Sequence, residues 1–176
     1  TWLLLTKRIG NVMKMQSNDS LMFDVMQRNV WLGASIVNQP EADRDIEKLL
    51  ATPAAKHFVS YEPAIAPVDF RASLHCRYHP SGRRGDCACD WPVLDQIIVG
   101  GESSQGGKKA RPFDIEWARS TVRQCKAASV AVFVKQLGSL PIIETRNESP
   151  FYCCFKNRAG ADPAEWPEDL RVQEWP

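Results

Sequence analysis

Five short apolar runs recur along this chain, and polar residues follow each of them directly. The runs are apolar on both faces, and most are rich in β-branched side chains. This pattern is typical of strands in a parallel sheet, which is covered on both sides. We therefore predict strands at Trp2–Leu5, Val30–Leu32, Phe58–Val59, Ile97–Val99 and Val130–Val134.

Helix-like segments lie between these runs. They cover Ser17–Arg28, Gln39–Ala51 and Asp114–Ser129, and each opens on residues suited to a helix start. The order β-α-β-α-β-insertion-β-α-β gives either a (β/α) barrel or an open doubly wound sheet. The side chains predicted to be buried are Leu21, Met22, Val25, Met26, Ile46, Leu49, Leu50, Ile115, Ala118, Val122 and Cys125.

Two segments break this α/β rhythm. Residues 69–95 form an insertion rich in Gly, Pro, Arg, His and Cys, and residues 141–176 form an irregular tail interrupted by prolines. A length of 176 residues suits one domain with a sizeable core. We expect residues 1–140 to form the body, and residues 141–176 to wrap around it with a short helix near 163–170.

Charge and cysteine content exclude some classes of protein. The net charge is +1, with 22 basic and 21 acidic residues, so the chain as a whole lacks the footprint of a protein that coats nucleic acid. No apolar run is long enough to span a membrane, and no signal peptide is visible. The six cysteines show no regular disulfide framework, so we expect a reducing, cytoplasmic setting.

The polar residues at the strand ends form the candidate site, because parallel α/β folds bind ligands outside the carboxyl ends of their strands. Carboxylates and cations that meet at one mouth are costly to desolvate without partners. They therefore either form a ring of salt bridges or hold a polar ligand. The candidates are Lys7, Arg8, Ser35, Ser60, Glu62, Glu102, Ser103, Lys135 and Gln136.

Three of these residues are candidates for catalysis: Glu62, Glu102 and Lys135. A general acid–base pair of Glu62 and Glu102 would suit an enzyme that acts on a sugar or a phosphate. The other candidates, with Gly100 and Gly101, are expected to bind a cofactor or substrate.

Gly100 and Gly101 end the fourth apolar run. Their surroundings match neither the dinucleotide-binding fingerprint nor the P-loop motif. We interpret the glycine pair as permitting close approach of a ligand or a neighbouring strand to the backbone. The stretch that follows, SSQGGKK, allows weak anion binding, although an ordinary loop is the simpler interpretation.

The insertion carries a set of residues that bind zinc in other proteins. Cys76, His79, Cys87 and Cys89 could close a tetrahedral zinc site, or they could be free thiols in a loop. Several arginines accompany them. Contact with nucleic acid or an acidic partner is one interpretation of this basic segment, and a solvated charge run is the other.

Five segments together resemble a known family. They are LLLTKR at 3–8, NVWLGASIVNQ at 29–39, and the segments 42–69, 97–138 and 162–176. They are similar to a phage-associated family of unknown function whose members are three-Cys-motif, radical-SAM-like proteins. The resemblance implies a partial (β/α) barrel that binds S-adenosylmethionine and a 4Fe-4S cluster, and a partner protein encoded nearby.

The chain departs from the family pattern at the cluster. Members carry a C-x6-C-x2-C-Y-A segment for the iron–sulfur cluster, and none of the six cysteines here has that spacing. The resemblance therefore implies an N-terminally truncated, distal part of a radical-SAM-like barrel that is inactive alone, because the cluster supplies the electron. The family motifs fall on Thr6–Arg8, Ser60–Pro63, Gly100–Ser103 and Lys135–Gly138, without assigned roles.

Two further expectations follow. A non-catalytic binding module, with the insertion as a zinc knuckle contacting a protein or nucleic acid, is the alternative to an enzyme acting on a nucleotide or nucleic acid. An open partial barrel also exposes strand edges, which must be covered by the tail, by another chain or by self-association.

Overall fold

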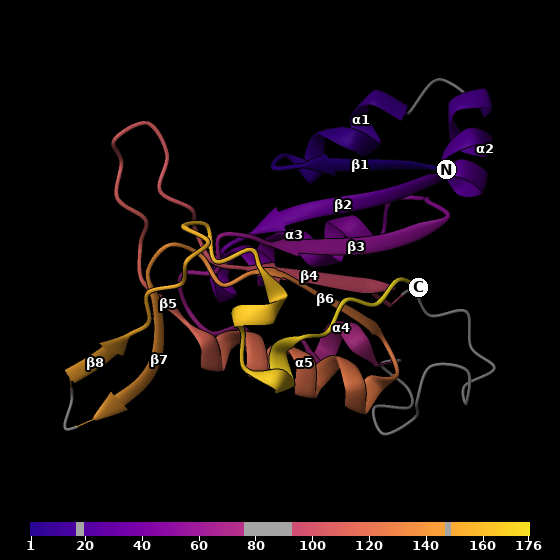
Figure 1. Cartoon of the computed structure of the whole chain (residues 1–176). Helices are drawn as coiled ribbons and strands as arrows, with labels where there is room; N and C mark the ends of the chain where they lie inside the picture. Colours follow the sequence, from indigo (N-terminus) through magenta and orange to yellow (C-terminus); the bar gives the residue numbers. More distant parts are fainter. Residues whose placement is uncertain (17–19, 76–92, 147–148) are drawn as a thin grey trace.

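The central sheet has five strands, all of them parallel (Figure 1). The computed structural model describes the whole chain except residues 17–19, 76–92 and 147–148. All five predicted strands are confirmed. Their bounds are β1 (Trp2–Thr6), β2 (Val30–Ile36), β3 (Lys56–Tyr61), β4 (Gln96–Gly100) and β6 (Ala131–Gln136).

The strand order across the sheet, β1-β2-β3-β4-β6, follows the order along the chain. A doubly wound sheet reverses its strand order at one point, and this sheet has no such reversal. The predicted α/β class is therefore confirmed, with a single direction of winding. The described strands form an open sheet and show no closed barrel.

The predicted helices form, and their first turns are capped as the sequence indicates. The side chain of Asn38 accepts a hydrogen bond from the Glu41 N–H at 3.1 Å. Asp114 accepts one from the Glu116 N–H at 2.9 Å. Each bond satisfies an N–H that lacks a partner within its helix. The helices are η1 (Ile9–Asn11), α1 (Val12–Gln16), α2 (Ser20–Asn29), α3 (Gln39–Leu50), α4 (Arg71–Leu74) and α5 (Ile115–Ala128).

The main core lies between the sheet and the helices. Val59, Ile97 and Val132 are fully buried in it. Alternate residues of a strand point to opposite faces, so Ser60, Ile98 and Phe133 face the other side, which we call the open face. The predicted burial of Ile46, Leu49, Ile115, Ala118 and Cys125 is confirmed, while Leu50 and Val122 are partly buried.

The burial of α2 differs from the prediction. Met26 is buried, but Leu21 is 70% exposed and Val25 is 39% exposed. α2 lies beside α1 and β1 at one edge of the molecule (Figure 1). An apolar stripe predicts a face suited to packing, but it does not say that another element covers that face. In the described ranges, no helix has the length and apolar character needed to cross a membrane.

The segment after residue 141 is more regular than predicted. β7 (Pro141–Arg146) and β8 (Ser149–Tyr152) form an antiparallel pair, and β7 also pairs with the short strand β5 (Phe113–Asp114). Beyond residue 152 the chain is irregular apart from two short 3-10 helices, η2 (Pro163–Glu165) and η3 (Glu168–Leu170). The short helix expected near 163–170 is thus present as two 3-10 turns.

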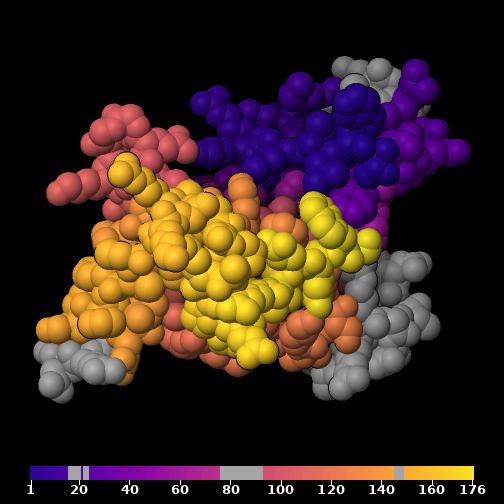
Figure 2. Space-filling view, in the orientation of Figure 1, coloured from indigo at the N-terminus to yellow at the C-terminus, as the bar shows by residue number. Residues whose placement is uncertain are grey.

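The last residues of the chain cover the free edge of β6. The Val134 N–H donates to the Val172 carbonyl at 2.8 Å, and the Glu174 N–H donates to the Val132 carbonyl at 3.0 Å. In Figure 2 this tail, in yellow, crosses the face of the molecule below the N-terminal strand, in indigo. The predicted wrap is confirmed at this edge. The described residues leave the opposite edge, at β1, without a strand partner.

The described ends of the predicted insertion pack against the body. Phe70, Leu74 and Leu94 are buried. The side chain of Gln124 on α5 also binds the backbone of this segment, accepting from the Phe70 N–H at 2.6 Å. Residues 69–75 therefore belong to the core layer, where they occupy the place of a longer helix between β3 and β4.

Candidate functional site

A cavity of about 420 Å³ opens on the open face of the sheet. Its size falls in the range of about 300–1,000 Å³ that small-molecule sites occupy. Strands β1, β3, β4 and β6 supply its floor, and the tail supplies one wall. The lining residues are Leu3, Leu5, Phe58, Ser60, Glu62, Ile98, Phe133, Lys135 and Trp175.

The strand register brings these side chains together. Ser60 pairs with Ile98 across the β3–β4 boundary, and Ile98 pairs with Phe133 across the β4–β6 boundary. The Trp175 ring lies against Phe133, with 5.3 Å between ring centroids, and 6.3 Å from the Trp31 ring. Aromatic rings therefore line the end of the cavity nearest the tail.

Gly33 makes room for one of these rings. A Cβ at this position would lie 2.3 Å from Cζ of Phe58, which is closer than atoms can approach. Because Gly33 and Phe58 are paired across β2 and β3, the ring lies over the glycine on the open face. The absence of a side chain at position 33 thus shapes the cavity floor.

The other end of the cavity is polar. Lys135 Nζ lies 2.9 Å from Glu62 Oε2, and the Ser60 hydroxyl lies 3.5 Å from the same oxygen. The Glu62 side chain is 16% exposed, while that of Lys135 is 55% exposed. The second carboxylate oxygen, Glu62 Oε1, is buried and has no hydrogen-bond partner among the described residues. A buried, unpaired carboxylate oxygen is costly, and a donor from a ligand would satisfy it.

The Gly100–Gly101 pair serves close packing between strands. A Cβ on Gly101 would lie 2.6 Å from the Leu137 carbonyl oxygen, and one on Gly100 would lie 3.0 Å from Glu62 Oε1. The Gly101 N–H also donates to the Gln136 carbonyl at 3.0 Å. These contacts match the predicted approach of a neighbouring strand, and they let the Glu62 side chain lie against β4.

Glu102 has a different environment from Glu62. Its carboxylate binds the Arg111 guanidinium at 2.8 and 3.0 Å and also accepts from the Arg111 N–H at 2.9 Å. These hydrogen bonds hold the pKa of Glu102 below its usual range. Glu102 is not among the residues lining the cavity, so the described geometry does not unite it with Glu62 as an acid–base pair.

Ser103 and Gln136 tie the strand ends together. The Gln136 amide donates to the Gly101 carbonyl at 2.7 Å and to the Ser103 hydroxyl at 2.9 Å. Ser35 is buried on β2, paired with Ser60. Lys7 and Arg8 follow β1 and are exposed. None of these predicted residues lines the cavity, although all lie at the same end of the sheet.

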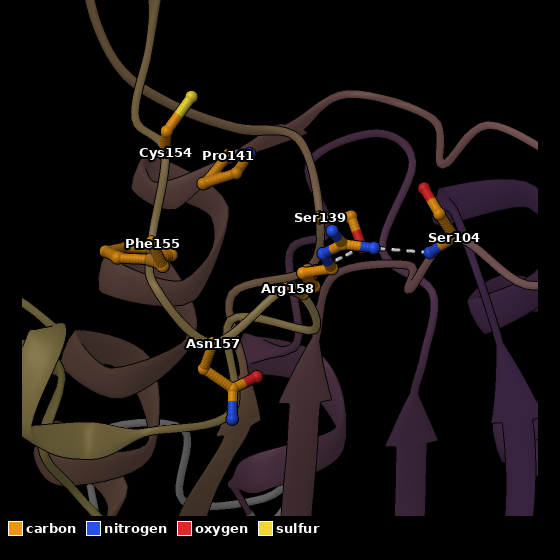
Figure 3. Close-up of a pocket in the computed structure, with 8 residues that line it drawn as sticks. Ser104, Ser139, Pro141, Cys154, Phe155, Asn157 and Arg158 are labelled. Atoms are coloured by element: carbon orange, nitrogen blue, oxygen red, sulfur yellow. Dashed lines mark hydrogen bonds between the residues drawn. The ribbon is translucent and has the colours of Figure 1, made fainter.

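A second, smaller cavity of about 240 Å³ lies beyond the strand ends (Figure 3). The Ser139 hydroxyl organises it, accepting from the Ser104 N–H at 2.9 Å and donating to the Arg158 carbonyl at 2.6 Å. Both bonds join backbone groups of neighbouring loops. We interpret this cavity as a seam between loops, because its polar side chain is occupied by structural bonds.

The predicted zinc ligands, Cys76, His79, Cys87 and Cys89, lie outside the described residues. In the described part of the chain, no group of three His, Cys, Asp or Glu side chains is placed to hold a metal ion. Cys125 is buried in α5, and burial raises the pKa of its thiol to about 12. Such a thiol is a packing residue and not a metal ligand.

The strand-end pattern found the polar end of the cavity but missed the apolar residues that line it. Leu3, Leu5, Phe58 and Phe133 belong to runs interpreted only as buried strand, and their alternation is the signal that separates one face from the other. Trp175 carries no local signal, because its position depends on pairing between the tail and β6.

Comparison with known proteins gives one match. No curated protein and no solved structure matches the chain. A family model described as "Protein of unknown function (DUF5131)" matches residues 1–159. The match covers most of the chain, which therefore belongs to this family.

Proposed function

We propose that the open-face cavity binds a small molecule with an aromatic part and a charged head group, of the S-adenosylmethionine class. The observation that carries this proposal is the Glu62–Lys135 pair at the polar end of the cavity, with one Glu62 oxygen buried and unpaired among the described residues. The resemblance to radical-SAM-like proteins suggests this ligand, and the residues present suit it.

The two ends of the cavity match the two parts of such a ligand. An amino-acid head group carries an ammonium and a carboxylate, which would meet Glu62 and Lys135 respectively. An adenine ring would lie among Phe133, Trp175 and Phe58, because aromatic faces favour stacking. Ser60, beside Glu62, offers a hydroxyl that can donate or accept.

The described residues do not fit the iron–sulfur cluster that the resemblance implies. Such a cluster needs several cysteine thiolates at one point. The described cysteines are Cys125, which is buried in α5, and the adjacent Cys153 and Cys154 near β8. We therefore assign no reaction step to this chain and propose that its described part supplies the binding face.

Calorimetric titration of the full chain with S-adenosylmethionine tests this proposal. We expect one site, and we expect Glu62→Gln and Lys135→Met each to weaken binding about tenfold or more, because each leaves a charge in the site unmatched. Adenosine, which lacks the head group, should bind wild type and Glu62→Gln equally. The matched control is Glu102→Gln, which should bind as wild type does.

Two outcomes would overturn the proposal. One is the absence of binding by the folded wild-type chain at millimolar ligand. The other is an equal loss of affinity in Glu102→Gln and Glu62→Gln, which would place the ligand outside the cavity.

A further inference from the structure

The strand β1 exposes four large apolar side chains in succession. Trp2 is 69%, Leu3 48%, Leu4 47% and Leu5 54% exposed. Two of them belong to each face of the sheet, and β1 is an outer strand with its second edge unpaired in the described structure. Parallel strands are normally covered on both faces, and free apolar edges invite pairing with another strand.

The helices beside β1 continue this apolar surface. Met13 and Met15 on α1, and Leu21 and Val25 on α2, are also exposed. α1, α2 and β1 lie along one edge of the molecule (Figure 1). We call these eight residues the N-terminal apolar edge.

The size of this surface matches that of a stable interface. Together the eight side chains expose apolar area on the order of 800 Å², which is about what each partner contributes to a standard interface. The largest apolar patch on a typical monomer covers about 300–600 Å². The surface also joins a strand edge to a helical layer, so its occupant must offer both.

We propose that the occupant is a second copy of this chain, paired through β1 about a two-fold axis perpendicular to the sheet. The same surface then meets itself, as in most soluble homodimers. The strands run antiparallel, and each copy places its own α1 and α2 beside those of its partner. This pairing does not depend on what the open-face cavity binds.

The symmetry determines the register. An axis perpendicular to the sheet keeps every side chain on its own face, so opposed residues must have numbers of equal parity. Setting Leu4 against the partner's Leu4 places Leu3 against the partner's Leu5 and Trp2 against the partner's Thr6. All five residues of β1 are then paired, and leucine meets leucine on both faces.

Sedimentation equilibrium over a range of concentrations tests the association. We expect wild type to dimerise, and Leu4→Lys to raise the dimer dissociation constant about tenfold or more, because two like charges would face each other at the axis. Phe151→Lys is the matched control: Phe151 is an exposed aromatic residue on β8, away from this edge, and its substitution should leave the dimer unchanged. Circular dichroism confirms that each variant is folded.

Cysteine pairing tests the register. Paired residues of antiparallel strands have Cα atoms about 4.5–5.5 Å apart, within the range that a disulfide spans. Under mild oxidation Leu4→Cys should link two copies, while Thr6→Cys in the same background should link no more than wild type. A monomeric wild type, an unchanged dimer in Leu4→Lys, or equal linking of Leu4→Cys and Thr6→Cys would each overturn the proposal.

Discussion

At the scale of single residues, Glu62 and Glu102 show that a shared position at the strand ends does not mean a shared role. Glu102 is saturated by three hydrogen bonds from Arg111, whereas Glu62 holds Lys135 and keeps one buried oxygen unpaired among the described residues. We therefore expect the loss of Glu102 to affect stability and the loss of Glu62 to affect binding. The sequence predicted both carboxylates as site residues, because polarity after a strand does not reveal the partner.

The Glu102→Gln variant should show a stability defect that depends on pH. Arg111 lowers the pKa of Glu102 from its usual 4.5, so the stabilisation is fully present above that value and is lost as pH falls through the lower pKa of the folded state. At neutral pH we expect a loss of about 1 kcal/mol or less, as for other exposed pairs. Urea unfolding of both proteins at several pH values measures the difference. A difference that stays constant into strong acid would show that the ion pair is not its source.

Gly33→Ala should disturb the cavity floor. The new Cβ would overlap the Phe58 ring, so the ring must move, and overpacking of this kind costs about 1–3 kcal/mol. Urea unfolding gives the cost. Gly10→Ala is the control, because its Cβ would meet only Lys48 Cδ at 3.7 Å. Equal stability of the two variants would mean that Phe58 does not rest on Gly33.

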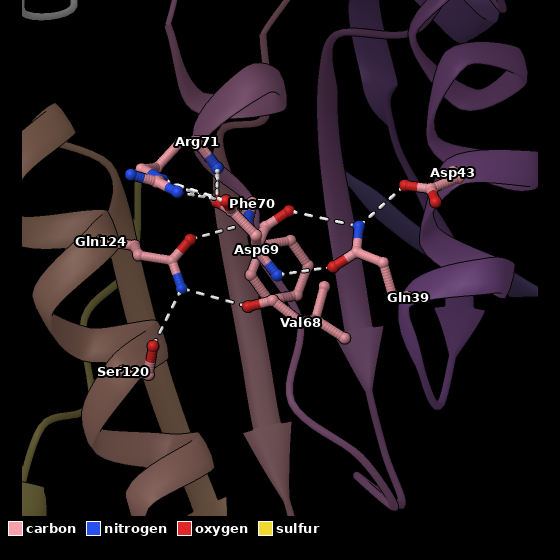
Figure 4. Close-up of polar contacts among 8 residues, drawn as sticks. All are labelled: Gln39, Asp43, Val68, Asp69, Phe70, Arg71, Ser120 and Gln124. Atoms are coloured by element: carbon pink, nitrogen blue, oxygen red, sulfur yellow. Dashed lines mark hydrogen bonds and ion pairs between the residues drawn. The ribbon is translucent and has the colours of Figure 1, made fainter.

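At the scale of elements, two glutamine side chains hold the segment that links β3 to β4 (Figure 4). Gln124 accepts from the Phe70 N–H at 2.6 Å and donates to the Val68 carbonyl at 3.1 Å. Gln39 binds Asp69 on the other side, accepting from its N–H at 2.7 Å. Side-chain amides thus replace the hydrogen bonds that a regular element would supply.

Gln124→Ala should therefore be destabilising. Two backbone groups beside the buried Phe70 would lose their partner, at a cost of about 1–3 kcal/mol. Arg123→Ala, on the exposed face of the same helix, controls for the change in helix propensity and should cost much less. Thermal unfolding of the two variants checks this. Equal losses would show that the clamp contributes nothing.

The elements also show where sequence patterns predict structure well. The five apolar runs became strands because a both-face apolar run has few other ways to be buried. The β7–β8 hairpin was missed, because Pro141 and Pro150 obscure the pattern, and its strands are partly or fully exposed. Exposed strands lack the burial that makes a pattern legible.

At the scale of the whole molecule, the tail joins the two ends of the chain's function as we propose it. Its backbone covers the β6 edge, and Trp175 closes one wall of the cavity. The amide of Gln96 donates to the Glu174 carbonyl at 2.7 Å, which fixes this arrangement on β4. Sequence patterns predicted a wrap but not its position, because the contacts join residues far apart in the chain.

Trp175→Ala should weaken ligand binding more than it weakens the fold. The ring packs on Phe133 and lies near Trp31, and aromatic pairs contribute about 0.5–1.5 kcal/mol each. We expect a stability loss of about 1–2 kcal/mol and an affinity loss of about tenfold, measured by urea unfolding and calorimetry. Phe151→Ala, which removes an exposed ring outside the cavity, should change neither. Full affinity in Trp175→Ala would exclude the tail from the site.

The central claim is that the open face of the sheet is the ligand-binding face. A crystal structure of the chain with S-adenosylhomocysteine tests it most directly. We predict that the ligand lies between β3, β6 and the tail, with its head group within hydrogen-bond distance of Glu62 and Lys135. A ligand bound elsewhere on the chain, or an empty cavity in crystals grown at saturating ligand, would contradict the claim.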